Sequence, residues 1–156
     1  SLLDEMLSAA NLAPSWKNSQ TPHFYVATGE KSKNAVREAL PEFNRKNSEN
    51  ASAYIVTTVV LNRSGFDKDG TAVTEIGNGR GYYDLGLNNM ALLLKATELG
   101  ISTLVMGIRD GEKLRKEFDI PETEAVVSII AVGYTDSEIV RPKRKSVEDF
   151  AKFYED

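Results

Sequence analysis

The chain has 156 residues and is 41% hydrophobic, which is enough for one domain with a buried core. Its 23 acidic and 19 basic residues give a net charge of -4, which argues against a general nucleic-acid or anionic-membrane surface. The absence of cysteine and the single His23 exclude disulfides, a catalytic thiol, iron-sulfur clusters and multi-histidine metal sites. We therefore predict a single domain over residues 1–156 that binds a small molecule, with an organic cofactor for any redox chemistry.

The apolar runs are too short to cross a bilayer, and the longest of them include residues 54–61. Asp4 and Glu5 occupy the position where a signal peptide needs positive charge. These features predict a cytoplasmic protein with neither a membrane nor a nucleic acid as its partner.

In the first half of the chain, apolar residues recur at helical spacing over residues 2–12, and Pro14 ends that pattern. Residues 23–27 read as a strand because Pro22 and Gly29 bound them. Residues 31–40 read as an amphipathic helix, and Pro41 begins a polar run that extends to residue 50. Residues 54–61 are rich in β-branched side chains without clean alternation, which predicts a central strand buried on both faces.

Residues 62–81 are charged and glycine-rich, which predicts a mobile loop and the best candidate for a lid. Residues 82–99 read as a long helix that is apolar nearly all round, and in a small domain such a helix needs a second subunit to bury it. Gly100 caps this helix. A strand over 101–106, a helix over 111–118 and a strand over 125–132 follow. Ser146 opens a terminal helix with Asp149 at its third position. This order predicts an α/β or α+β sandwich.

The polar loop over residues 13–20 could offer hydroxyl, amide and aromatic groups to a planar heterocycle. Its local chemistry alone favours a simpler interpretation, in which Ser15 and Asn18 satisfy the backbone of a turn. Trp16 could equally be a stacking residue over a site or a dimer contact.

Other candidate features have plainer alternatives. The basic run at Arg141 and residues 143–145 would by itself indicate a solvated surface. Residues 77–81, Gly-Asn-Gly-Arg-Gly, hint at a dinucleotide fingerprint, but no strand immediately precedes them, which favours a flexible hinge over a Rossmann site. His23 is predicted to be structural, and Asp84 to serve only the dipole of its helix.

Several motifs taken in order resemble the nitroreductase family along nearly the whole chain. They are residues 13–20 followed by Phe24-Tyr25-Val26, Tyr83-Asp84-Leu85-Gly86 through Asn89-Met90 to Glu98-Leu99-Gly100-Ile101, Val105-Met106-Gly107, Val132-Gly133-Tyr134, and Arg141-Pro142-Lys143-Arg144-Lys145. The resemblance implies an α+β fold with a mixed, largely antiparallel sheet flanked by helices. It also implies a homodimer that binds FMN between its protomers.

The same resemblance implies roles for individual residues. Those expected to bind the cofactor are Pro14, Ser15, Asn18, Gln20, Asn44, Met106, Gly107, Lys143 and Arg144. Among these, Asn44 would meet the polar edge of the ring, Gly107 would let backbone approach it, and Arg144 would hold the phosphate, with Lys143 replacing the family's companion lysine. Trp16 and Lys17 would line the substrate pocket.

The implied activity is an NAD(P)H-dependent, ping-pong reduction of nitroaromatics, quinones or similar electron-poor acceptors, in which flavin N5 carries the hydride. No side chain is then needed as an essential acid or base. The family's arginine-rich segment before the first helix does not occur in these residues, so we expect weakened FMN binding, since a charge-assisted hydrogen bond is worth about 1.5 to 3 kcal/mol. The alternative is a non-enzymatic flavin- or nucleotide-binding dimer of the same fold.

Overall fold

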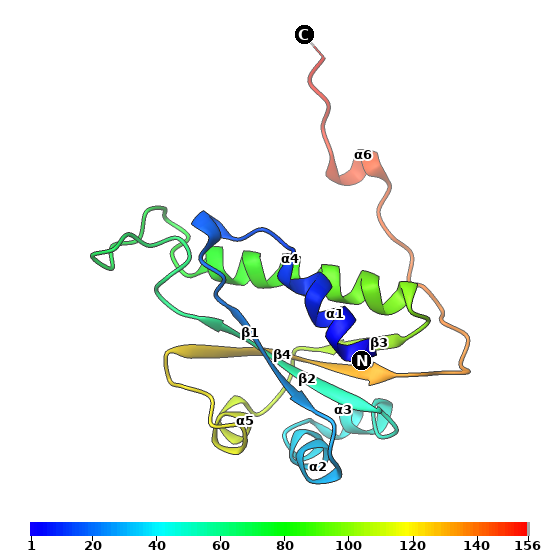
Figure 1. Cartoon of the computed structure of the whole chain (residues 1–156). Coiled ribbons are helices and arrows are strands. Elements are labelled where there is room, and N and C mark those ends of the chain that lie inside the picture. Colours follow the sequence, from blue (N-terminus) through cyan, green and yellow to red (C-terminus); the bar gives the residue numbers. More distant parts are fainter. Residues whose placement is uncertain (156) are drawn as a thin grey trace.

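The computed structural model describes residues 1–155 and contains one four-stranded sheet (Figure 1). The strands lie in the order β1-β2-β4-β3, and each neighbouring pair is antiparallel. Their bounds are β1 Pro22–Ala27, β2 Ala53–Val60, β3 Ser102–Met106 and β4 Glu124–Gly133. The predicted α+β fold with a largely antiparallel sheet is confirmed. The Rossmann alternative is wrong, because such a fold needs parallel strands joined by crossover helices.

Helices cover both faces of the sheet, with α1 and α4 on one face and α2, α3 and α5 on the other (Figure 1). Their bounds are α1 Leu2–Asn11, α2 Glu30–Glu38, α3 Glu42–Asn47, α4 Gly79–Glu98, α5 Gly111–Glu117 and α6 Val147–Phe150, and a 3-10 turn spans Trp16–Asn18. Among the described residues, no helix is both long and apolar enough to cross a membrane.

Strand β2 lies inside the sheet and sends alternate side chains into two separate cores. Tyr54 and Val56 pack in the core beneath α2 and α5, whereas Ala53 and Ile55 pack in the core beneath α1 and α4. Because both faces of β2 are covered, its sequence shows no polar alternation. The prediction of a central, doubly buried strand is confirmed.

The polar run after Pro41 is a correction to the sequence interpretation, because it contains the helix α3. Pro41 follows the end of α2 at Glu38, as predicted, and is itself the N-cap of α3, with an extended backbone (φ -62°, ψ 156°). Proline is well tolerated at a helix start, where its missing N–H would have no helical partner.

The loop between β2 and α4 is shorter than predicted, since α4 already begins at Gly79. The backbone N–H of Asn62 donates to Asn78 Oδ1 at 2.7 Å, and Asn78 Nδ2 donates to Asn62 Oδ1 at 3.0 Å, so residues 62–78 form a loop closed at its base. The predicted hinge over residues 77–81 is wrong for its second half. Gly81 is buried within α4, where an added Cβ would lie 2.8 Å from Val59.

The chain after β4 leaves the body of the protein as an extended tail (Figure 1). Ser146 opens the predicted terminal helix and forms a capping box with Asp149, but this helix has only four residues. Large apolar side chains on this tail are exposed, among them Val140, Phe150, Phe153 and Tyr154.

Candidate functional site

The loop between α1 and β1 has an unusual backbone. Lys17, Asn18 and Gln20 adopt left-handed conformations, with φ values of 47°, 54° and 49°. Asparagine tolerates this region well, but lysine and glutamine do so less readily. The hydroxyl of Ser15 accepts a hydrogen bond from the Gln20 N–H at 3.0 Å, which closes the loop on itself. The side chains of all three left-handed residues are exposed, so this conformation presents their polar groups to solvent.

Trp16 is half-buried. Two cations lie close to its ring, since Arg80 Cζ is 5.2 Å and Lys17 Nζ is 5.6 Å from the ring centroid. Its indole Nε1 is buried and has no hydrogen-bond partner among the described residues. An indole N–H normally finds an acceptor when it is buried, so this group could still donate to one.

The prediction that Asp84 serves only the dipole of its helix needs correction. It is the sixth residue of α4, beyond the turn where the helix dipole acts most strongly, and its side chain is only 3% exposed. Its carboxylate accepts hydrogen bonds from the Trp16 backbone N–H and from the Ser64 hydroxyl. Asp84 lies in the run 82–87, whose other residues are apolar or glycine, and this was the sequence signal for such a buried partner.

A second group of predicted residues meets where β3 ends. Asn44, on α3, donates from Nδ2 to the backbone oxygen of Ile108 at 3.4 Å. Met106 is buried in the core, whereas Gly107 is exposed and a Cβ added to it would meet no heavy atom within 4 Å. The structure therefore brings Asn44 and the 106–108 backbone together beside open space.

A chain of hydroxyl contacts that the sequence analysis missed supports Asn44. The buried Tyr54 hydroxyl donates to the backbone oxygen of Ser48, and the Ser48 hydroxyl donates to the backbone oxygen of Asn44 at 2.8 Å. Tyr54 belongs to β2, so the centre of the sheet fixes the end of α3. These contacts join residues from separate elements, and nothing in their local sequence marks them.

The predicted phosphate ligands Lys143 and Arg144 lie on the extended tail (Figure 1). Arg144 Nη1 donates to the backbone oxygen of Pro142 at 3.0 Å, and within residues 1–155 no hydrogen bond or ion pair joins these cations to the other two groups. Pro14 is exposed beside the left-handed loop. The single chain thus brings together the 14–20 residues, and separately Asn44 with Gly107, but not the tail cations.

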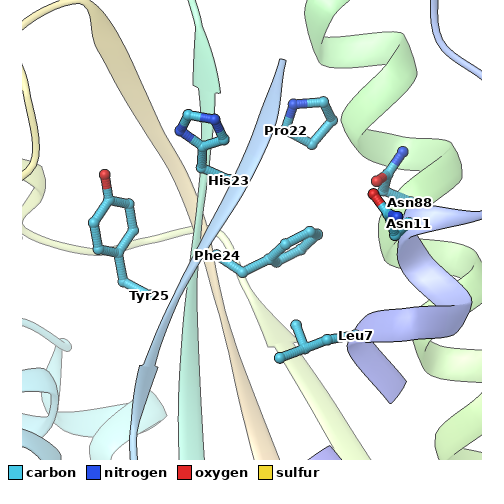
Figure 2. Close-up of a pocket in the computed structure, with 7 residues that line it drawn as sticks. All are labelled: Leu7, Asn11, Pro22, His23, Phe24, Tyr25 and Asn88. Carbon is cyan, nitrogen blue, oxygen red and sulfur yellow. The ribbon is translucent and has the colours of Figure 1, made fainter. Parts of the chain in front are cut away.

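Two surface hollows lie near β1 and the left-handed loop. One, of about 490 Å³, runs along the edge strand β1 and is lined by Leu7, Asn11, Pro22, His23, Phe24, Tyr25 and Asn88. Figure 2 shows His23 and Tyr25 on one side of β1, with Phe24 on the other side facing Leu7. The second hollow, of about 530 Å³, is lined by Lys17 and residues 66–69. Lys17 is the predicted pocket residue that lines it.

Glu124 forms a polar cluster beside the first hollow. Its side chain, 5% exposed, receives hydrogen bonds from Thr58 Oγ1 at 2.5 Å and Tyr25 Oη at 3.0 Å, and its Oε1 lies 2.7 Å from His23 Nδ1. Burial opposes ionisation of Glu124, but these hydrogen bonds outweigh it and hold its pKa below the ordinary value. Burial and the nearby carboxylate raise the pKa of Tyr25 to about 12. His23 is thus part of a structural cluster, as predicted.

Within residues 1–155, no three histidine or acidic side chains are placed to share a metal ion.

The sequence profile of the nitroreductase family matches residues 1–134, and the chain belongs to this family. No curated protein sequence matches it significantly. Solved structures share its fold at low identity. A nitroreductase family protein from Streptococcus pneumoniae has a TM-score of 0.82 and 20% identity over 98% of this chain and 88% of its own.

Two further solved structures have the same fold and more specific names. CLA-ER, an enone reductase of gut-bacterial fatty acid saturation, has a TM-score of 0.83 and 21% identity, covering 97% of this chain and 85% of its own. An oxidoreductase containing FMN has a TM-score of 0.73 and 24% identity, covering 87% of this chain and 67% of its own. The TM-scores show the shared fold, and at these identities the likeness extends to the fold alone.

Proposed function

We propose that the protein is an FMN-dependent oxidoreductase that uses NAD(P)H to reduce nitroaromatic, quinone or similar electron-poor acceptors by a ping-pong mechanism. The observation that carries the proposal is the left-handed loop of a nitroreductase family member, which presents Asn18 and Gln20 to solvent on a fixed backbone. The FMN-containing oxidoreductase and the enone reductase of the same fold support the cofactor and the class of acceptor.

The chemistry of the exposed groups fits a flavin. Asn18 and Gln20 carry both amide donors and carbonyl acceptors, which match the alternating polar atoms of an isoalloxazine edge and a ribityl chain. At the end of β3, the open space at Gly107 would let a ring lie against backbone, next to the amide of Asn44. We propose that these four residues, with Pro14, Ser15 and Met106, hold the cofactor.

Arg144 and Lys143 are the proposed phosphate ligands. A guanidinium suits bidentate contact with a phosphate, and both cations belong to the exposed tail. Because this tail leaves the body of its own chain, we propose that the complete site requires a second protomer (Figure 1).

Exposed apolar surface supports a homodimer. On α4, Tyr83, Met90 and Leu94 are 61%, 50% and 58% exposed, and Val105 on β3 is 49% exposed. Exposed apolar surface that is extensive enough marks interfaces, and the exposed apolar residues of the tail add to it. We propose that two copies bury these surfaces against each other, as expected for a helix that is apolar nearly all round.

When bound, FMN would supply the redox chemistry, accepting a hydride from the nicotinamide and passing reducing equivalents to the acceptor. The side chains then bind and orient. Asn18, Gln20 and Asn44 would bond the polar edge, and Lys17 and Trp16 would border the acceptor. No ionisable side chain of the left-handed loop or of the Gly107 turn is assigned a proton-transfer role.

Reconstitution of the full chain with FMN tests this proposal. We expect a yellow protein that oxidises NADH or NADPH and transfers the electrons to a nitroaromatic or a quinone. A yellow protein without turnover would instead support the non-enzymatic flavin-binding dimer. If the chain bound no FMN at concentrations up to about 1 mM, the proposal would be rejected, because a dissociation constant above this value is too weak for a cofactor site.

A further inference from the structure

Asp84 is a charged side chain held inside the protein by two loops. Its Oδ2 atom accepts from the Trp16 backbone N–H at 3.1 Å and from the Ser64 hydroxyl at 2.5 Å, and the residue is 3% exposed. A buried carboxylate is costly unless hydrogen bonds compensate it, and bonds to an ionised acceptor are stronger than neutral ones. The two donors precede α4 in the sequence and belong to different loops.

The first of these loops needs an external anchor. Left-handed backbone at Lys17, Asn18 and Gln20 persists only where the surrounding structure fixes it. Ser15 closes the loop internally, through its bond with Gln20. In the described part of the chain, the bond from Trp16 to Asp84 is the one hydrogen bond that ties residues 15–20 to another element.

The second loop shares this anchor. Ser64 lies near the base of the closed loop 62–78, beside the pair of Asn62 and Asn78. Lys17 Nζ also lies 3.8 Å from Asp67 Oδ1, although both side chains are more than half exposed, so this ion pair contributes little. Arg80 of α4 also lies over the Trp16 ring, 5.2 Å from its centroid, but it contacts the side chain. The bond to Asp84 is the contact that holds the Trp16 backbone, and the same carboxylate holds Ser64.

We propose that Asp84 is a positioning residue of the flavin site, one that fixes the Trp16 backbone and thereby the directions in which Asn18 and Gln20 point. The expected effect on FMN binding rests on the proposed function, whereas the anchoring of the Trp16 backbone by Asp84 does not. Asp84 does not touch the cofactor. Its bond to Ser64 makes the same carboxylate the attachment point of the neighbouring 62–78 loop.

The test uses Trp16, the single tryptophan of the chain, as a fluorescent reporter of its own loop. The full chain and the variants Asp84→Asn and Ser64→Ala are compared before and during titration with FMN. Asp84→Asn keeps the size of the side chain but removes the charge, whereas Ser64→Ala removes one donor and leaves the Trp16 bond in place. Thermal unfolding confirms that each variant folds cooperatively.

We expect Asp84→Asn to shift Trp16 emission to longer wavelength, to increase its quenching by acrylamide, and to weaken FMN binding about tenfold. Ser64→Ala should leave Trp16 emission unchanged and affect FMN less. Wild-type fluorescence in Asp84→Asn, or equal effects of the two variants, would overturn the proposal.

Hydrogen exchange in the wild-type chain gives an independent measurement that requires no variant. The Trp16 amide should exchange as slowly as amides within α4, because it is bonded to a buried acceptor. Exchange as fast as that of the exposed tail would contradict the anchoring. If the wild-type chain binds no FMN, the proposed function fails, while the fluorescence and exchange results still decide the role of Asp84.

Discussion

Two buried carboxylates, Asp84 and Glu124, differ in what they hold together. Glu124 receives its hydrogen bonds from β1 and β2, which are already joined by the sheet. Asp84 receives its bonds from two loops that have few other attachments. The same chemistry therefore reinforces strands that are already paired in one case and fixes the geometry of loops outside the sheet in the other.

This difference predicts separable consequences for stability and for binding. Loss of the Glu124 carboxylate should reduce the free energy of unfolding with no change in FMN affinity. Loss of contacts at the proposed flavin site should reduce FMN affinity with little change in stability.

The largest expected effect belongs to Glu124→Gln. The substitution replaces an ionised acceptor of several hydrogen bonds by a neutral amide, and we expect the free energy of unfolding to fall by about 2 kcal/mol. Urea unfolding measures this loss, and FMN titration of the same variant should match the wild type. Reduced FMN affinity without lost stability would break the distinction between the two carboxylates.

The stability contributed by Glu124 should also depend on pH. Since its folded-state pKa lies below the ordinary value of 4.5, the ionised group stabilises the protein above that value. The contribution falls as the pH decreases from 4.5 through the lowered folded-state pKa. Melting temperatures measured from about pH 7 down to about pH 3 span the ordinary pKa values of Glu and Asp. Toward the acidic end of this range, the melting temperature of Glu124→Gln should decline less steeply than that of the wild type.

Next in size is the effect of Gly107→Val on the cofactor. Its side chain would enter space that contains no protein atom within 4 Å of the Cβ, so folding should be retained while FMN affinity falls about tenfold or more. Gly29→Ala is the control, because Gly29 lies at the N-cap of α2 and an added Cβ makes only an ordinary contact there. Equal FMN affinity in Gly107→Val and the wild type would show that the isoalloxazine ring does not bind beside Gly107.

A smaller effect is expected from Tyr54→Phe. This substitution removes the hydroxyl that bonds Ser48 but keeps the aromatic ring in the core, so the unfolding free energy should fall by about 1 kcal/mol. Because Ser48 in turn bonds Asn44, FMN affinity should fall slightly as well. An unchanged unfolding midpoint in urea would show that the hydroxyl contributes nothing to the position of α3.

The smallest effect is expected from Lys17→Ala. Its exposed ammonium lines the hollow with residues 66–69, so kcat/KM should change by about two- to threefold, and unequally among acceptors of different charge. Steady-state kinetics with a neutral quinone and an anionic nitroaromatic measure this change. The same kcat/KM values as the wild type for both acceptors would remove Lys17 from the substrate pocket.

The sheet and most helices could be predicted because their signals are local. Strand β2 can be recognised from its run of β-branched residues, and helix α4 from apolar residues that recur nearly all round it. The helix α3 was missed because it has only six residues, is mostly polar, and depends on contacts between Tyr54 and Ser48. Proline at its N-cap resembled an interruption.

The site was less accessible to prediction, because its supports join distant parts of the chain. Asp84 lies 68 positions from Trp16, and Glu124 lies 101 positions from His23. Contacts between residues so far apart cannot be recognised from a single sequence. The assignments of Asn18, Asn44, Gly107 and Arg144 to FMN stay predictions that depend on the resemblance to the family.

The most direct test of the account is a titration of the full chain with FMN, followed by the fluorescence of Trp16. A flavin bound beside the left-handed loop would lie close to this single tryptophan and should quench most of its emission, saturating at one FMN per chain. Tryptophan emission that stays constant while FMN binds, or the absence of saturable binding, would contradict the proposed site.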